Sequence, residues 1–180
     1  MLLAIVPLVA LAGSGMSVSS DHWPDDYDPH FRKYTKHYFG PHVDWKWFKA
    51  QGIAESGLRP EVKSSVGARG IMQILPGTYA EIKQLNPHFR AIDDPRWNIA
   101  AGIYYDRLQY RKWQDGLPTN ERLAFAFASY NAGYGGVLTA YKRAKQEVDL
   151  VREWSQVAPH APKETRSYVK RIRGLMSPPD

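Results

Sequence analysis

The stretch VDWKWFKAQGIAESG, residues 43–57, carries the clearest helix signal in the 180-residue chain. Asp44 is a good N-cap, and Val43 with Phe48 can form the hydrophobic staple around it. Gly57 is of the residue type that most often stands just past the end of a helix. The stretch therefore predicts one helix with a defined start and a defined end.

Similar cap and spacing signals recur along the rest of the chain, whereas strand-like alternation is scarce. Residues 58–70 contain a proline and two glycines and are expected to form a loop. We therefore predict a single all-α domain over residues 43–175. Its further helices are expected over 76–85, from Asp94–Pro95 through Leu108, from Thr119 or Asn120 to Gly133, over 137–144 and over 165–173.

The two ends of the chain differ in character from this body. Residues 1–12, MLLAIVPLVALA, are apolar and uncharged, and a small-residue cleavage pattern follows them. We expect a signal peptide here, with an uncleaved anchor or a buried first helix as alternatives. Residues 13–42 are rich in Ser, Asp, Pro and His and are expected to be a linker or N-terminal extension. Export to the periplasm or the outer face of the inner membrane follows from the signal peptide.

Charge and composition restrict the partners. The net charge is +6, but four acids fall within residues 21–28, so the remainder carries +10. A basic body suggests an anionic partner such as a membrane surface or an acidic cell wall, and a merely solvated surface is the alternative. No nucleic-acid-binding signature is visible, so we expect no nucleic acid partner, and we expect a monomer.

Metal and thiol chemistry receive no support from the sequence. The chain has no cysteine, which excludes disulfides, thiolate metal sites and cysteine nucleophiles. None of the six histidines lies in a His-Glu-x-x-His pattern. We expect no metal and no cofactor.

Glu55 is the candidate catalytic residue. It lies in the last turn of the first strong helix, where the helix dipole places partial negative charge. A carboxylate there, and more so beside an apolar wall, is expected to have a raised pKa, as a general acid at neutral pH requires. An exposed glutamate that merely ends a helix is the alternative from local sequence alone.

Four motifs in order favour the catalytic interpretation. They are Glu55-Ser56-Gly57, the run SSVGARGIMQILPGT over residues 64–78, ASYNAG over residues 128–133, and ETRSYV over residues 164–169. This array resembles the soluble-type lytic transglycosylases, which are related to goose-type lysozymes. The resemblance implies a lysozyme-like all-α fold and cleavage of the β-1,4 bond between MurNAc and GlcNAc in peptidoglycan.

In that family a single acid suffices, because the C6 hydroxyl of MurNAc serves as the nucleophile and a 1,6-anhydro sugar results. The resemblance thus implies that Glu55 is both general acid and general base. A hydrolytic lysozyme on the same fold and an inactive wall-binding module are the alternatives. The ordinary two-carboxylate scheme would need a second flanking acid, and Glu61 is the only acid between Glu55 and Glu81.

Further roles are carried over by motif position. The resemblance implies substrate contacts from five residues. Gln73 could instead be satisfied by backbone, Tyr130 and Tyr168 could be core residues, and Glu164 could stabilise the start of a helix. Arg69 occupies a position that is often small in the family and is expected to meet a substrate carboxylate. The five substrate-binding candidates are Ser64, Gln73, Tyr130, Glu164 and Tyr168.

Overall fold

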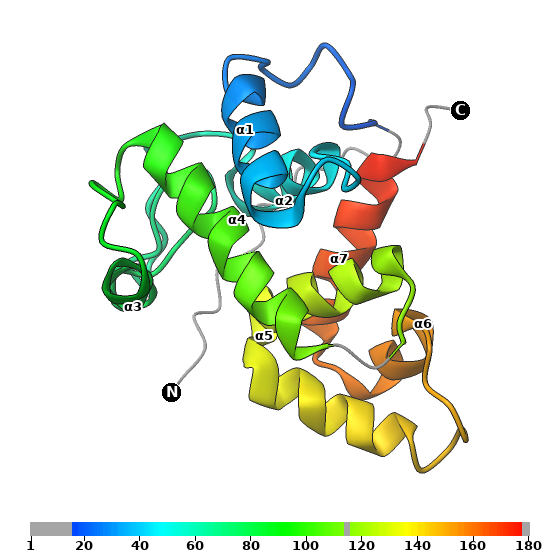
Figure 1. The fold of residues 1–180 in the computed structure, drawn as a ribbon. Coiled ribbons are helices and arrows are strands. Elements are labelled where there is room, and N and C mark those ends of the chain that lie inside the picture. Colours follow the sequence, from blue (N-terminus) through cyan, green and yellow to red (C-terminus); the bar gives the residue numbers. More distant parts are fainter. Residues whose placement is uncertain (1–15, 114–115, 178–180) are drawn as a thin grey trace. The chain divides into compact units, whose positions relative to one another are not determined.

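The computed structural model describes residues 16–113 and 116–177, and the regular elements in these residues are helices joined by loops (Figure 1). Within them there is no β-strand, only isolated bridges from Arg69 to Lys63 and to Ile74. The expected signal peptide or anchor, residues 1–12, lies outside the described residues. The elements are α1 (Asp28–Phe39), α2 (Lys46–Ser56), α3 (Pro76–Leu85), α4 (Pro95–Lys112), α5 (Thr119–Ala144), α6 (Trp154–Val157), a 3₁₀ helix η1 (Ala158–His160) and α7 (Lys163–Met176).

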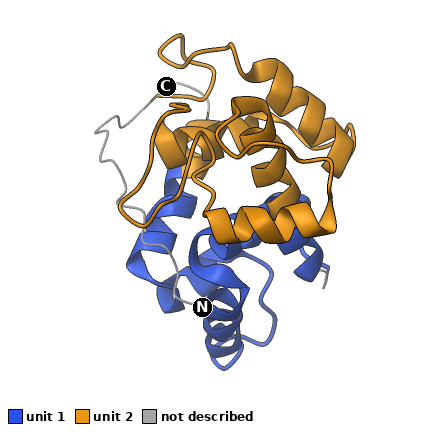
Figure 2. Cartoon of the chain, turned by 90° about the vertical axis from the view of Figure 1, so that its left-hand side faces the viewer, with its two compact units in different colours: residues 1–3, 106–171 blue, residues 4–105, 172–180 orange. Residues whose placement is uncertain are grey.

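The described residues divide into two compact units (Figure 2). Unit 2 contains residues 16–105 and 172–177, and unit 1 contains residues 106–113 and 116–171. Helices α4 and α7 contribute residues to both units. None of the helices in the described part of the chain is both long and apolar enough to cross a membrane.

Unit 2 is built around the contact between α1 and α2. Gly52, in the middle of α2, makes this contact close. A Cβ at this position would lie 3.1 Å from the side chains of Phe31 and Leu58 and 3.2 Å from that of Ile71. The glycine therefore lets α1 and the chain after α2 pack directly on the helix backbone.

Helix α1 lies within residues 13–42, which the sequence predicted to be a linker or N-terminal extension. Phe31, Tyr34 and Thr35 are buried, so one face of the helix belongs to the core of unit 2. The spacing i, i+3, i+4 is that of an amphipathic helix. Two of the three buried residues carry hydroxyl groups and the exposed face is strongly basic, which hid the apolar pattern in the sequence.

Unit 1 is held by aromatic packing around α5. The ring centroid of Trp113 lies 4.9 Å from that of Phe125, and Trp154 meets Phe125 edge-on at 5.6 Å. The indole N–H of Trp113 donates to the hydroxyl of Ser129 at 3.0 Å, so the buried ring has its polar atom satisfied. Helix α5 packs against α6 and η1, which the sequence interpretation did not include.

Candidate active site

Glu55 is half-buried and lies in the last turn of α2, as the sequence predicted. The carboxylate of Asp44 accepts the N–H of Lys46, the first residue of the helix, at 3.0 Å, and the N-cap position itself is Trp45, one residue later than predicted. At the other end Gly57 adopts left-handed φ and ψ of 66° and 32°, and Leu58 follows with φ of 61°. Two left-handed residues in succession turn the chain sharply away from the helix directly after the candidate catalytic residue.

Ser56, next to Glu55, ties the helix end to the following loop. Its buried hydroxyl donates to the carbonyl of Ile71 at 2.9 Å and accepts the N–H of Arg59 at 3.1 Å. These two bonds fix the backbone on which Glu55 sits. The sequence interpretation included Ser56 in the motif but gave it no function.

Ser64 occupies a tight turn in the loop. Its hydroxyl accepts the N–H of Ala68 at 3.0 Å, and its own N–H donates to the Ala68 carbonyl at 3.0 Å. The side chain is half-buried, and a hydroxyl that accepts one bond still has its hydrogen to donate. The geometry is compatible with the predicted substrate contact and shows in addition that Ser64 holds the turn.

Gln73 holds the loop from the inside. It is buried in a left-handed conformation with φ of 45°, which is uncommon for a residue with a side chain. Its amide nitrogen donates to the carbonyls of Val62 at 3.0 Å and Gly70 at 2.8 Å. Both amide hydrogens are thereby used within the loop, whereas the buried side-chain oxygen has no partner among the described residues. The backbone therefore satisfies the donor half of the side chain, and the substrate contact of Gln73 stays a prediction.

Asn98 of α4 is the centre of this network and was not singled out from the sequence. Its side-chain oxygen accepts the N–H of Met72 at 2.8 Å. Its amide nitrogen donates to the carbonyls of Arg69 at 2.9 Å and Ile92 at 3.0 Å. A Cβ at Gly70 would lie 2.6 Å from that nitrogen, so the glycine makes room for the amide. The sequence shows that Asn98 lies one helical turn after Asp94, at the start of the helix. A single asparagine in a helix has no distinctive pattern, however, so its bonds to the loop could not be predicted.

Arg69 has an acidic partner within unit 2, and its contact with a substrate carboxylate stays a prediction. Its guanidinium makes an ion pair with the carboxylate of Asp93 at 3.1 Å. Both side chains are partly exposed, so the pair is a surface contact of modest strength. The cation expected to meet a substrate carboxylate is thus already paired within unit 2.

Unit 1 brings the third and fourth motifs together. The hydroxyl of Thr165 in α7 donates to the side-chain oxygen of Asn131 in α5 at 2.8 Å. Helix α5 is interrupted two residues later at Gly133, where φ is 72° and ψ is 146°. The predicted helix end at Gly133 is therefore seen as a kink between two helical segments.

The remaining predicted residues of unit 1 differ in exposure. Tyr130 is half-buried on α5, and Glu164 is half-buried in the first turn of α7, where the helix dipole favours an acid. Tyr168 is only 2% exposed, which favours the core alternative that the sequence left open. The substrate contacts of all three stay predictions.

Comparisons with known proteins agree with the motif array. The family model described as "Transglycosylase SLT domain" matches residues 33–150. The chain is 35% identical to the soluble lytic murein transglycosylase of Salmonella typhimurium over 90% of its length. It is 28% identical to the membrane-bound lytic murein transglycosylase F of Vibrio campbellii over 82% of its length. It spans 24% and 29% of these two relatives, respectively.

A solved structure extends the agreement to the fold. The 70 kDa soluble lytic transglycosylase of Escherichia coli matches with a TM-score of 0.70 and 31% identity, over 86% of this chain and 24% of that one. The all-α, lysozyme-like fold expected from the sequence is confirmed by this match. The chain therefore belongs to the transglycosylase SLT domain family.

Proposed function

We propose that this chain is a peptidoglycan lytic transglycosylase in which Glu55 is the only general acid and base. The reaction cleaves the β-1,4 bond between MurNAc and GlcNAc without water and leaves a 1,6-anhydroMurNAc end. Relatives of both the soluble and the membrane-bound kind are named as lytic murein transglycosylases, and the solved relatives include a complex with bulgecin A. Family membership supports the reaction class.

The observation that carries the proposal is the fixed placement of Glu55 on a helix end. A general acid needs a constant distance to the atom that it protonates. The left-handed turn at Gly57 and the bonds of Ser56 hold the backbone that directly follows Glu55. Glu55 is half-buried, so one part of its surface is left for a substrate.

One carboxyl group can carry out both proton transfers of the proposed reaction. The acid form of Glu55 donates its proton to the glycosidic oxygen while the bond from that oxygen to C1 breaks. The resulting carboxylate takes the proton of the C6 hydroxyl while the C6 oxygen bonds to C1. Glu55 thus returns to its acid form, and no second carboxylate is required.

Supporting roles are assigned by motif position. We assign the hydroxyl of Ser64 a hydrogen bond to the sugar near the scissile bond, and Tyr130 and Glu164 further contacts to the glycan. Gln73 in unit 2 and Tyr168 in unit 1 are buried, so we assign each of them a supporting position within its own unit. Peptidoglycan lies outside the cytoplasm, and we propose that the protein acts in the periplasm or at the outer face of the inner membrane.

The test is Glu55→Gln against the matched control Glu61→Gln, which removes an exposed acid six residues further on. We expect Glu55→Gln to reduce digestion of purified peptidoglycan by about 10²- to 10⁴-fold and Glu61→Gln to leave it unchanged. Mass spectrometry of the wild-type products separates the reactions, because anhydro ends are lighter by one water than reducing ends. Reducing ends alone would establish the lysozyme alternative, and equal activity of Glu55→Gln would refute the role of Glu55.

Anionic surfaces are the second partner that we propose. The basic body should be attracted to wall carboxylates or anionic lipids, and salt should weaken this attraction because the Debye length falls from about 10 Å at 0.1 M to about 3 Å at 1 M. Cosedimentation of the Glu55→Gln protein with purified wall across that range measures it. Binding that does not change with salt would mean that the charge is incidental.

A further inference from the structure

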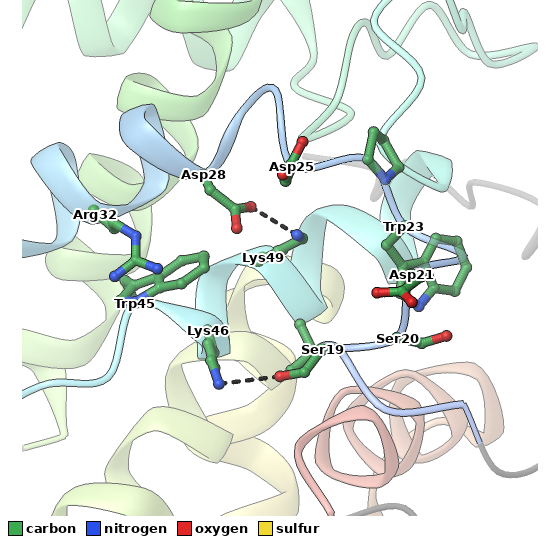
Figure 3. Close-up of a pocket in the computed structure, with 12 residues that line it drawn as sticks. Ser19, Ser20, Asp21, Trp23, Asp25, Asp28, Arg32, Trp45, Lys46 and Lys49 are labelled. Atoms are coloured by element: carbon green, nitrogen blue, oxygen red, sulfur yellow. Dashed lines mark hydrogen bonds and ion pairs between the residues drawn. The ribbon is translucent and has the colours of Figure 1, made fainter.

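A cavity of about 500 Å³ lies at the other end of α2, within unit 2 (Figure 3). Its walls come from the loop of residues 18–25, the first turns of α1 and the start of α2. Trp45 marks this end of the helix and Glu55 the opposite end. At a rise of 1.5 Å per residue the two are roughly 15 Å apart along the axis, so the cavity is separate from the candidate catalytic residue.

Opposite charges line opposite walls of this cavity. The loop contributes Asp21 and Asp25, and the helices contribute Arg32 and Lys46; Figure 3 shows the two acids on one side and the two cations on the other. Among the described residues neither acid has an ion-pair partner within 4.0 Å. The cavity therefore presents a negative wall that faces a positive one.

The charges deeper in the cavity are already satisfied. The ammonium of Lys49 and the carboxylate of Asp28 form an ion pair at 2.7 Å, with side-chain exposures of 6% and 19%. This pair is neutral as a unit and joins α1 to α2. The outer acids and cations are therefore the groups that can pair with charged atoms of a ligand. One of these cations, the ammonium of Lys46, also donates a hydrogen bond to the hydroxyl of Ser19 at 3.0 Å.

Two tryptophans complete the lining. The guanidinium carbon of Arg32 lies 4.1 Å from the ring centroid of Trp45, so the cation is held in place by the ring. Trp23 is 9% exposed, and its buried indole N–H has no hydrogen-bond partner among the described residues. Buried donors are nearly always paired in folded proteins. The N–H of Trp23 is buried in this structure, so Trp23 contributes its ring to the cavity lining, and this donor is not a ligand contact.

We propose that this cavity binds a short zwitterionic peptide, with its ammonium against Asp21 and Asp25 and its carboxylate against Lys46 and Arg32. A ligand with only one charge could form ion pairs with one wall, and the charged residues of the other wall would gain no ligand partner. The volume suits a ligand of a few residues. The site is independent of the reaction proposed for Glu55.

The experiment is a ¹⁵N NMR titration that follows the indole N–H signals of the tryptophans. The probes are trialanine, N-acetyl-trialanine, trialanine amide and the doubly blocked tripeptide, which differ only in their end charges. We expect trialanine to bind in the millimolar range, each singly blocked form to bind at least fivefold more weakly, and the doubly blocked form not to bind. Absence of shifts with trialanine, or equal binding of the doubly blocked form, would refute the proposal.

Two variants assign the ends of the ligand. Asp25→Asn should weaken trialanine and trialanine amide but not N-acetyl-trialanine, and Lys46→Gln should weaken trialanine and N-acetyl-trialanine but not the amide. Lys142→Gln, an exposed lysine of α5, is the control for loss of one positive charge. Equal loss for all ligands in either variant, or loss in Lys142→Gln, would show that net charge and not the two walls controls binding. Because the readout is binding, it does not depend on whether the Glu55 reaction is correct.

Discussion

The two ends of helix α2 are built in opposite ways. At the C-terminal end, beside Glu55, buried polar groups bond to the backbone: Ser56, Gln73 and Asn98 together hold the loop that follows. At the N-terminal end the polar groups are charged, mostly exposed and arranged around an open cavity, with the Lys49–Asp28 pair as the one buried contact. We call the C-terminal end, where buried side chains bond to the backbone, the closed end of α2. We call the N-terminal end, where charged residues line a cavity, the open end.

The difference shows what the motif residues do. Two polar side chains of the second motif, Ser64 and Gln73, bond to backbone groups of their own loop, so these residues help to preserve the shape of the loop that follows Glu55. A catalytic carboxylate needs a fixed backbone, whereas a site for a small charged ligand needs unpaired charge at a surface. We therefore expect substitutions at the closed end to reduce stability most, and substitutions at the open end to affect ligand binding more than stability.

The largest expected effect is that of Asn98→Ala at the closed end. It removes the Asn98 partner of the N–H of Met72 and of the carbonyl of Ile92, whereas the carbonyl of Arg69 still accepts the N–H of Ile74 at 3.1 Å. A buried group that loses its partner costs about 1–3 kcal/mol. We expect the free energy of unfolding to fall by about 4 kcal/mol in urea denaturation. A loss below about 1 kcal/mol would contradict the central position of Asn98.

Gly70→Ala, compared with Gly67→Ala, separates backbone strain from crowding within the same loop. Both glycines have left-handed φ, 73° and 85°, so each alanine costs about 1–2 kcal/mol of strain. Only at Gly70 does the new Cβ meet Asn98, at 2.6 Å, whereas no described atom lies within 4 Å of a Cβ at Gly67. We expect about 3 kcal/mol of destabilisation for Gly70→Ala and about 1 kcal/mol for Gly67→Ala. Equal losses would mean that the closed end tolerates crowding.

Lys49→Met probes the single buried contact at the open end. Removing one partner of a buried ion pair leaves the other charge unpaired, which costs about 3–5 kcal/mol at full burial. Asp28 is partly exposed and lies at the start of α1, where the helix dipole favours an acid, so we expect about 2 kcal/mol. The double variant Lys49→Met, Asp28→Leu should recover most of the loss. A loss greater than that of Asn98→Ala would overturn the contrast between the two ends.

Much of the fold was predictable because helix caps are local. The carboxylates of Asp44 and Asp94 accept N–H groups in the first turns of α2 and α4, and the sequence shows both. The helix predicted over residues 76–85 matches α3. Helix α1 was missed because its buried residues include a tyrosine and a threonine among charged neighbours. Its Asp28–Pro29 start was the available signal, since it repeats the Asp94–Pro95 start of α4.

The candidate site was predictable only in part. Order and spacing of the motifs identified Glu55, but whether Ser64 or Gln73 faces a ligand or its own loop depends on bonds between residues far apart in the sequence. Asn98 bonds across 26 residues to Met72, which no local pattern reveals. The open cavity was not predicted, since most of its wall comes from the segment that was interpreted as a linker.

The smallest expected effect concerns pH at α1, which forms part of the open end. Burial, followed by the positive charge of Arg96, lowers the pKa of His30 below its usual 6.5, with Asp94 opposing and Lys33 assisting. The unfolded chain therefore binds more protons than the folded one, and stability falls as the pH falls. The contribution of His30 is fully present above about pH 6.5 and is lost as the pH falls through the lower folded pKa. Between pH 7 and 5 we expect the Tm of the wild type to decrease more steeply than that of His30→Gln, with His42→Gln, an exposed histidine, as the control. Parallel curves for the wild type and His30→Gln would show that protonation of His30 does not affect the docking of α1.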